Sequence, residues 1–370
     1  MKLTGLYIEN FGCLHRYDLE FGDGITVVCG KNGVGKTTLL EAIHLLCEGF
    51  SFRTHSLAEL TTWNAPEMIL RGELANSAES GRVFTRALSL NRNSGMTVKK
   101  DGVVCKSPAA FFGDLPAVIM QPADMEMVHG APESRRRYLD ELLCFKNVRN
   151  ADLLRRYRRV LAERNQWLRQ NKLGRAVGGE DLYTVLTQQL MDLGAKLWME
   201  RIALVKEISP LIVNYYEMLA GKSDDVFVSY RSSAFDYSPE KEFTEEKLRN
   251  SFAYKLDNVD LSERMQGMTL AGPHKDDLYL SLHRHEMRTS GSQGQCRSAA
   301  IALRLASSDL ASVHLVKPVL LLDDIFAELD KNRRGAVADV IRDKKCQVFV
   351  ATPRAEDLPF TADETIELNA

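Results

Sequence analysis

The segment from Gly30 to Thr37 has the residue types and the spacing of a loop that wraps a phosphate chain. Its sequence, GKNGVGKT, fits the pattern G-x-x-x-x-G-K-[ST] at every fixed position. Backbone N–H groups of such a loop turn toward phosphates, and the following helix adds the partial positive charge of its N-terminus. We expect Lys36 to reach the β- and γ-phosphates of a nucleotide and the Thr37 hydroxyl to hold Mg²⁺. The other nucleotide-binding residues predicted here are Gly30, Lys31, Asn32, Gly33, Val34, Gly35 and Thr38.

Two adjacent carboxylates, Asp323 and Asp324, supply the acidic groups that such a site needs. They end the run PVLLLDD at residues 318–324, which predicts a buried strand that emerges at the edge of a sheet. We expect Asp323 to hold Mg²⁺ and Asp324 to orient or deprotonate the water that attacks the phosphate. The alternative is a strand followed by an ordinary polar turn, which explains the apolar run but not the doubled acid.

A second candidate phosphate-binding segment, GSQGQ at residues 291–295, precedes a helical pattern. Glycines and a serine at the start of a helix can bind phosphate. Because the first loop already surrounds its own phosphates, this segment has a use if it faces a nucleotide held by another copy of the chain. Ser292, Gly294 and Gln295 are therefore predicted to contact ATP across an ATP-dependent homodimer. An ordinary loop is the alternative, and the acidic pair downstream weakens it.

These residues need a sheet whose strands end close together, and the first and last thirds of the chain have the patterns of an α/β fold. Alternating or apolar runs bounded by turn residues predict strands, and longer periodic runs predict helices. The strands are expected over 2–11, 25–30, 67–76, 82–91 and 115–122, within 268–282, and over 317–324 and 347–352. Helices are expected after the phosphate loop, after residue 295 and over 331–343.

The middle of the chain predicts two long helices. Leu154, Leu161 and Leu168 recur every seven residues, and a glycine-rich turn follows at 174–180. An apolar stripe with spacings of three and four then continues past Pro210, where we expect a bend. The pattern predicts an antiparallel pair that is too short to form an extended coiled-coil arm. We therefore expect residues 1–122 and 268–370 to form one sheet-based domain and residues 123–267 to form an inserted helical domain.

The composition is that of an ordinary globular protein. The chain has 370 residues, 45% of them hydrophobic and 26% charged. It contains no uncharged apolar run of about 18 residues, which argues against a membrane span, and its start lacks the apolar block of a secretory signal. The seven cysteines form no C-x-x-C pair, so neither a zinc site nor a disulfide framework is indicated. We expect a cytoplasmic protein without a membrane partner.

Positive charge is concentrated in one stretch. Residues 135–175 hold thirteen Lys and Arg against four Asp and Glu, a local charge of +9 in a chain whose net charge is −2. Basic residues on a helical face can neutralise nucleic-acid phosphates without reading bases. A solvated helical face is the alternative, and for residues 135–137 so are ion pairs with Asp140 or Glu141. The candidate DNA contacts are Arg135, Arg136, Arg137, Arg155, Arg156, Arg158 and Arg159.

The phosphate loop, the SxGQ segment and the double acid together resemble the ATP-binding-cassette (ABC) ATPases. Longer segments are similar, in the same order, to the RecF family of bacterial recombination mediators. They are GFSFRTHSL (49–57), DMEMVHGAPESRRRYLD (124–140), AGPHKDDL (271–278), SQGQ (292–295) and LLLDDIFAELD (320–330). The resemblance implies an ABC-type P-loop ATPase head, related to SMC heads, with mixed sheets, an inserted helical lobe and no long coiled coil.

The resemblance also implies roles for individual residues. The signature Ser292 would contact the γ-phosphate of ATP across a homodimer, and Gln121 would take the position of a metal-sensing glutamine. The catalytic group is then expected to comprise Lys36, Gln121, Ser292 and Asp324, and the metal group Thr37, Gln121 and Asp323. Arg53 would link DNA to ATP, or it is a salt-bridged surface residue.

The function implied by the resemblance is that of a DNA-binding protein in replication and recombinational gap repair. It would dimerise on ATP, bind double-stranded and gap or junction DNA, and work with RecO- and RecR-type partners to load RecA onto single-stranded DNA, also during the SOS response to damage. It would be a weak, DNA-stimulated ATPase. Two alternatives remain open: an ATPase subunit of a membrane transporter, and an ATP-switched DNA clamp with negligible hydrolysis.

Three features depart from these patterns or stand outside them. Gly12 follows Asn10-Phe11 where RecF proteins commonly have Arg, which puts a phosphate or base contact there in doubt. Pro122-Ala123-Asp124 replaces a common Pro-Glu-Asp. The segment GPHKDD at 272–277 could suggest a metal or acid–base cluster, but we expect a structural junction where the insertion rejoins the sheet.

Overall fold

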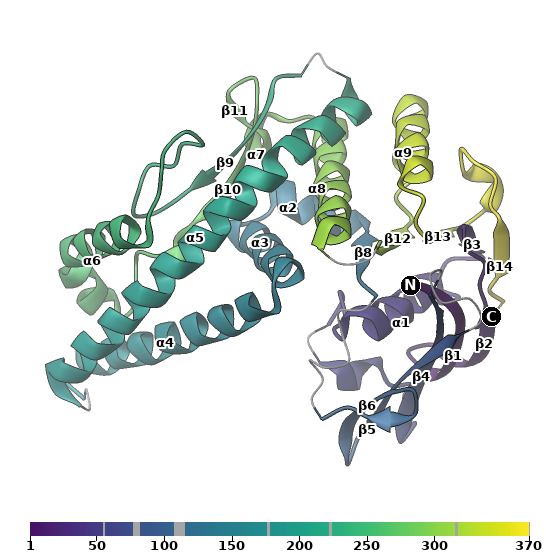
Figure 1. The fold of residues 1–370 in the computed structure, drawn as a ribbon, viewed down its shortest axis with the longest axis horizontal. Helices are drawn as coiled ribbons and strands as arrows, with labels where there is room; N and C mark the ends of the chain where they lie inside the picture. Colours follow the sequence, from purple (N-terminus) through teal and green to yellow (C-terminus); the bar gives the residue numbers. More distant parts are fainter. Residues whose placement is uncertain are drawn as a thin grey trace. The chain divides into compact units, whose positions relative to one another are not determined.

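The chain folds into two compact units, one inserted into the sequence of the other (Figure 1). The computed structural model describes residues 1–54, 56–76, 82–106, 115–175, 178–221, 224–314 and 317–369. The first unit comprises Met1–Asp124 and Ser307–Ala370, and the second comprises Met125–Ala306. By packing, residues 268–306 therefore group with the insertion, whereas the sequence assigned them to the sheet-based domain.

A parallel five-stranded sheet forms the centre of the first unit. Its strand order is β14-β3-β13-β12-β8, and every neighbouring pair is parallel. Four of its strands are almost wholly buried, which explains their continuous apolar sequences. The strands are β3 (Ile25–Cys29), β8 (Ala117–Met120), β12 (Val319–Asp323), β13 (Val348–Thr352) and β14 (Glu364–Glu367). Strands were expected from the sequence at each of these places except β14.

A second sheet in the first unit is antiparallel, with the order β2-β1-β4-β5-β6-β7. The two strands that the sequence predicted to be adjacent, β4 and β5, pair from Glu67↔Asn91 to Ala75↔Val83. Alternate residues of β1 and β4 are buried, as expected for a sheet with one face in the core. The strands are β1 (Lys2–Phe11), β2 (Leu14–Glu20), β4 (Glu67–Ala75), β5 (Val83–Asn91), β6 (Gly95–Lys100) and β7 (Val103–Val104).

Helix α1 (Lys36–Glu48) joins the two sheets into one core. It contacts β8, β12 and β13 of the parallel sheet and β1, β4 and β5 of the antiparallel sheet. Nearly all of its residues are therefore buried, including Leu39, Leu40 and Ile43, which belong to a core cluster of apolar side chains drawn from both sheets. The helix begins where the phosphate loop ends, so the packing of α1 fixes the position of that loop. Helix α9 (Lys331–Lys344) follows β12 in the sequence.

The second unit is built mainly from helices. The predicted antiparallel pair is α4 (Val148–Lys172) and α5 (Gly179–Ala220), and α6 (Glu245–Gln266) packs against both (Figure 1). Helix α5 continues through Pro210, and residues 176 and 177 of the expected turn lie outside the described part of the chain. A three-stranded antiparallel sheet has the order β11-β10-β9. Its strands are β9 (Val226–Arg231), β10 (Asp277–Leu282) and β11 (His285–Glu286).

Four other helices and several short 3-10 turns are the remaining elements of the described residues. The helices are α2 (Glu126–His129), α3 (Pro132–Lys146), α7 (Met287–Ser290) and α8 (Gln293–His314). The 3-10 turns are η1 (Leu57–Leu60), η3 (Pro122–Met125), η4 (Pro273–Lys275) and η5 (Ala355–Asp357). The pairing of β10 with β9 explains why residues after 268 pack with the insertion. Among the described residues, no helix has the length and apolar character needed to cross a bilayer.

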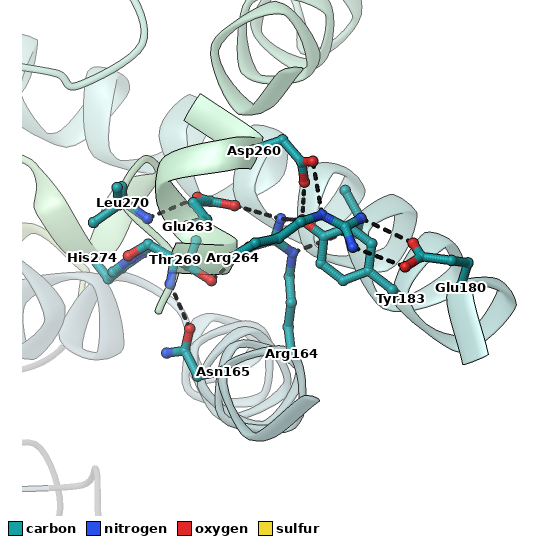
Figure 2. A network of polar contacts seen from close by, with 11 residues as sticks. Arg164, Asn165, Glu180, Tyr183, Asp260, Glu263, Arg264, Thr269, Leu270 and His274 are labelled. Carbon is teal, nitrogen blue, oxygen red and sulfur yellow. Dashed lines mark hydrogen bonds and ion pairs between the residues drawn. The ribbon is translucent and has the colours of Figure 1, made fainter. Parts of the chain in front are cut away.

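A buried polar network holds α4, α5 and α6 together (Figure 2). The Arg164 side chain on α4 and the Glu263 side chain on α6 are 1% and 0% exposed, and they form an ion pair of 2.7 Å. Three further guanidinium N–H groups of Arg164 donate to Thr187 Oγ1, Tyr183 Oη and Thr269 Oγ1. Because burial of an unpaired charge is costly, these four partners stabilise an arginine at this buried position.

Candidate functional site

The phosphate loop lies between β3 and α1 and depends on glycine for its shape. Gly30 and Gly35 have φ values of 147° and 107°, which L-residues with side chains rarely adopt. A Cβ atom at Gly30 would lie 2.5 Å from the Leu368 carbonyl oxygen, and one at Gly35 would lie 2.7 Å from Leu14 Cδ2. The surrounding chain thus leaves room only for glycine at both positions.

Lys36, the first residue of α1, directs its ammonium group back into this loop. Its Nζ atom donates to the carbonyl oxygens of Gly30 at 2.8 Å and Lys31 at 3.0 Å. The side chain is largely buried, so solvent screens its charge less than it screens the charge of an exposed lysine. A cation enclosed by a loop at a helix N-terminus is the arrangement that favours binding of a polyphosphate.

Thr37 and Asp323, which are 286 positions apart in sequence, meet at the carboxyl edge of the parallel sheet. The Thr37 hydroxyl lies 2.9 Å and 3.0 Å from the two carboxylate oxygens of Asp323 and donates to them. Burial raises the pKa of Asp323, and the Thr37 hydrogen bond opposes that shift. A hydroxyl beside a carboxylate is a suitable oxygen donor set for Mg²⁺.

Asp324 follows with a backbone conformation that is unusual for its residue type. Its φ is 53°, in the left-handed region, and its N–H donates to the Ala351 carbonyl oxygen at 3.1 Å. Its Oδ1 atom is buried and has no hydrogen-bond partner within the described ranges. Burial also raises the pKa of this carboxyl, while the charge of Lys36 lowers it. A half-buried carboxylate with one buried, unused acceptor oxygen can take a proton from a water molecule.

Gln121 joins this group through the strand order. It directly follows β8, which pairs with β12 in parallel so that Met120 lies opposite Leu322. Gln121 therefore reaches the same sheet edge as Asp323, and its backbone N–H is fixed by Asp124 Oδ2 at 2.8 Å. No cluster of three His, Cys, Asp or Glu side chains suited to a metal occurs in the described part. A metal here would instead rely on Thr37, Asp323 and Gln121 together with phosphate and water oxygens.

The SxGQ segment belongs to the second unit and caps α8. The Ser292 Oγ atom accepts from the Gln295 N–H at 3.3 Å, and the Gln295 Oε1 atom accepts from the Ser292 N–H at 3.0 Å. This reciprocal pair is a capping box, which the S-x-x-Q spacing could have indicated and our interpretation missed. Ser292 is exposed and Gly294 is half-exposed. Their predicted contact with nucleotide across a homodimer remains a prediction.

The basic residues predicted to bind DNA separate into two groups, and the prediction for Arg135 is wrong. Arg135 is 4% exposed and donates through Nε and Nη2 to the two Asp277 oxygens at 2.7 Å and 2.9 Å. Arg136 donates to the backbone oxygen of Asp276. The alternative partners expected for residues 135–137 are also wrong, because Asp140 pairs with Arg158 and Arg201 and Glu141 pairs with Arg304.

The other candidates are accessible. Arg155 and Arg159 on α4 have side chains that are 79% exposed, and each pairs with an acid on the same helix, Asp152 and Glu163. Such exposed pairs contribute little stability, so these side chains can exchange partners readily. Arg156 and Arg137 are exposed and have no side-chain partner among the residues described. Their contact with DNA stays a prediction, and the packing shows which of these arginines are exposed.

The segment 272–277 has a structural role, as expected, but it lies inside the second unit and not where the chain returns to the first. Asp276 is buried and accepts hydrogen bonds from Trp198 Nε1, Tyr230 Oη and the Ser233 N–H. His274 Nε2 lies 3.2 Å from the Thr269 carbonyl oxygen, to which it must donate, so Nδ1 accepts from Tyr157 Oη at 2.8 Å. Burial lowers the pKa of His274 to about 4, which fits this neutral form.

The chain is similar to proteins of one family along its length. A family model described as RecF/RecN/SMC N terminal domain matches residues 2–369. "DNA replication and repair protein RecF" of Geobacter sulfurreducens is 33% identical over 366 residues, which cover 99% of this chain and 96% of the relative. The protein of the same name from Streptomyces avermitilis is 33% identical over 363 residues, covering 97% and 95%.

Solved structures show the same similarity. A structure of the recombination mediator protein RecF-ATPrS in the RecFOR pathway has a TM-score of 0.89 and 26% identity, covering all of this chain and 96% of that one. The corresponding RecF-ATP structure has a TM-score of 0.85 and 26% identity, covering 99% and 97%. An Smc head bound to a ScpA domain has a TM-score of 0.57 at 14% identity, covering 99% and 94%, and that likeness concerns the fold alone.

Proposed function

Because the chain belongs to the RecF/RecN/SMC family and matches RecF proteins over its length, we propose that it is an ATP-dependent DNA-binding protein of replication and recombinational gap repair. Its fold is that of an ABC-type ATPase head. We place it in the RecFOR pathway in the cytoplasm, where it would help RecA to load onto single-stranded DNA at gaps, also in the SOS response. RecO- and RecR-type proteins would be its partners.

The observation that carries this proposal is the convergence of Lys36, Thr37, Asp323 and Asp324 at one sheet edge. Loop N–H groups and Lys36 would bind the phosphates of ATP. Thr37, Asp323 and Gln121 would hold Mg²⁺, which when bound neutralises charge that develops on the phosphates. Asp324 would orient the attacking water and accept its proton at Oδ1. Hydrolysis would be slow and DNA-stimulated, and ATP would act as a switch.

A second copy of the chain would complete the site. Ser292, Gly294 and Gln295 lie at the start of a long helix, where Ser292 is exposed and the other two are half-exposed, so they are accessible to a neighbouring subunit. Backbone N–H groups there could bind the γ-phosphate held by the loop of the other copy. ATP would then join two subunits, and its cleavage would release them.

DNA would be bound by the accessible arginines, chiefly Arg137, Arg155, Arg156 and Arg159. They can pair with backbone phosphates of double-stranded, gap or junction DNA without reading base sequence. Pairing of two copies would bring two such surfaces together, so ATP would strengthen DNA binding. The transporter alternative has no support, because the relatives from Geobacter sulfurreducens and Streptomyces avermitilis are DNA replication and repair proteins.

The test compares Asp324→Asn, Lys36→Ala and the control Asp339→Asn, which makes the same change at an exposed position of α9. With ATP and Mg²⁺, mass by light scattering should show a long-lived dimer for Asp324→Asn, and a monomer that binds no nucleotide for Lys36→Ala. The control should match wild type. ATP turnover should fall at least tenfold in Asp324→Asn. A monomeric mass for both wild type and Asp324→Asn would refute the sandwich. Equal turnover in wild type and Asp324→Asn would favour the clamp with negligible hydrolysis.

A further inference from the structure

A buried carboxylate on the phosphate-loop helix takes no part in the chemistry described above. Glu41 lies in α1, and its side chain is 1% exposed. Its Oε1 atom accepts from Ser51 Oγ at 2.5 Å, and its Oε2 atom accepts from Arg53 Nη1 at 3.0 Å. The same Ser51 oxygen accepts from the backbone N–H groups of Arg53 and Thr54 at 2.9 Å and 3.0 Å. Glu41 thus holds a short segment of the following loop at three points, directly or through Ser51.

This arrangement lies beside the candidate nucleotide site. Glu41 follows Thr37 by four residues, so both side chains lie on the same face of α1, one turn apart. Thr37 bonds to Asp323, and the charge of Arg53 contributes to lowering the pKa of Asp323 against the larger effect of burial. Arg53 therefore contributes positive charge at the group that would bind phosphate and metal.

The Arg53 guanidinium is only partly used. Its side chain is 53% exposed, and Nη1 is its one side-chain atom with a partner among the described residues. The fork of a guanidinium can bind a carboxylate on one side and a phosphate on the other. An arginine that is already held loses less rotamer entropy when it binds an anion than a mobile surface arginine does.

We propose that Glu41 is a positioning residue of the nucleotide site: through Arg53 and Ser51 it ties residues 51–54 to the phosphate-loop helix, so that a polyphosphate bound at the loop also orders this segment. The proposal rests on the proposed function, since ATP is the anion concerned. Binding of nucleotide at the loop thereby orders an exposed part of the surface without any change in the sheet.

The test uses Glu41→Gln, Arg53→Ala and the double variant in the full chain. Glu41→Gln keeps an acceptor for Ser51 but removes the charge that holds Arg53. The matched control is Glu59→Gln, the same change at an exposed residue of η1 that accepts from Thr54 Oγ1. Affinity is measured with mant-ATP and Mg²⁺, and amide hydrogen exchange is measured at Arg53 and Thr54 with and without ATP.

We expect ATP to slow exchange at both amides in wild type and in the control, and to do so much less in Glu41→Gln. The Kd for mant-ATP should rise about tenfold in Glu41→Gln and in Arg53→Ala, and no further in the double variant, because one residue acts through the other. Additive effects on Kd, or unchanged exchange in Glu41→Gln, would overturn the proposal. If Glu41→Gln does not fold, an unchanged Kd for mant-ATP in Arg53→Ala would overturn the proposal. Failure of wild type to bind mant-ATP would instead count against the proposed function.

Discussion

At the scale of single residues, the candidate site depends on side chains whose surroundings change their ordinary behaviour. Burial raises the pKa of both Asp323 and Asp324, which makes each carboxylate a better proton acceptor than it would be in water. Asp324 also keeps a left-handed backbone that costs about 1 kcal/mol or more for a residue with a side chain. Strain and desolvation at the same residue are typical of a functional site, where structure is selected for chemistry over stability.

Ser292 combines a capping role with a predicted role in dimerisation, and two substitutions separate them. Ser292→Ala removes the cap of α8 and should cost about 1 kcal/mol of unfolding free energy. Ser292→Asp keeps a capping oxygen but places negative charge where a γ-phosphate would bind. We expect both variants to bind mant-ATP and to remain monomeric in ATP and Mg²⁺ by light scattering. An Asp variant that dimerises like wild type would show that Ser292 serves only as a cap.

His274 should make the stability of the second unit depend on pH. Its pKa is lowered to about 4 by burial, below its ordinary value of 6.5. The neutral form therefore stabilises the fold fully above pH 6.5, and this contribution is lost as the pH falls from 6.5 toward 4. The loss should reach about 3 kcal/mol. Urea unfolding, followed by tryptophan fluorescence, measures the unfolding free energy between pH 6.5 and pH 4. Over this range it should fall by about 3 kcal/mol less in His274→Gln than in wild type.

At the scale of elements, two helices explain how the units hold their functional parts. Helix α1 is enclosed by both sheets of the first unit, so the phosphate loop at its start is held by the core. Helix α4 carries its exposed arginines on one side while Arg164 on the other side joins the buried network (Figure 2). The network thus gives a fixed orientation to a helix whose outer face is strongly basic.

Removal of one charge from that network should destabilise the second unit. Glu263→Gln leaves Arg164 buried with hydrogen-bond partners but without its counter-charge, and should cost about 3–5 kcal/mol of unfolding free energy. Glu180→Gln is the control. Glu180 forms two hydrogen bonds with Arg264 but its side chain is 64% exposed, so its loss should cost less than about 1 kcal/mol. Urea denaturation of the three proteins at pH 7 measures the difference, and equal losses would contradict the assigned role of the network.

At the scale of the whole molecule, the distribution of charge matters more for the proposed DNA binding than the net charge does. The overall charge of −2 includes a stretch of +9, and most of the exposed arginines of that stretch lie on α4 of the second unit, with Arg137 on α3. Lys36 and Asp323, which we propose to act in nucleotide binding, lie in the first unit. A protein organised in this way can respond to ATP in one unit and contact DNA with the other.

DNA affinity should therefore fall steeply with salt. If Arg155, Arg156 and Arg159 each contact a phosphate, the slope of log K against log salt should become shallower by about three in the triple alanine variant. Fluorescence anisotropy with a gapped duplex, in ATP and Mg²⁺, measures both slopes. Lys247→Ala, an exposed charge on α6, serves as the control and should leave the slope unchanged. An unaltered slope in the triple variant would place the DNA surface elsewhere.

The sequence by itself determined the parts whose geometry is local. A phosphate loop needs only a strand, glycines that permit positive φ and a helix start, so GKNGVGKT predicted its position and that of the elements around it. Likewise, a buried run ending in two acids placed Asp323 and Asp324 at the edge of a sheet. Local rules also covered the Ser292 cap, although its spacing was interpreted only as a phosphate-binding motif.

Only the tertiary structure decided which distant side chains meet. Arg135 looked like its neighbours in sequence, yet it is buried against Asp277, which lies 142 positions away. Residues 268–306 were expected to return to the first domain, but the pairing of β10 with β9 keeps them in the second unit. The physical reason is that charge pairing and burial depend on which segments pack together. The local sequence of a run of arginines does not indicate which carboxylate each one will face.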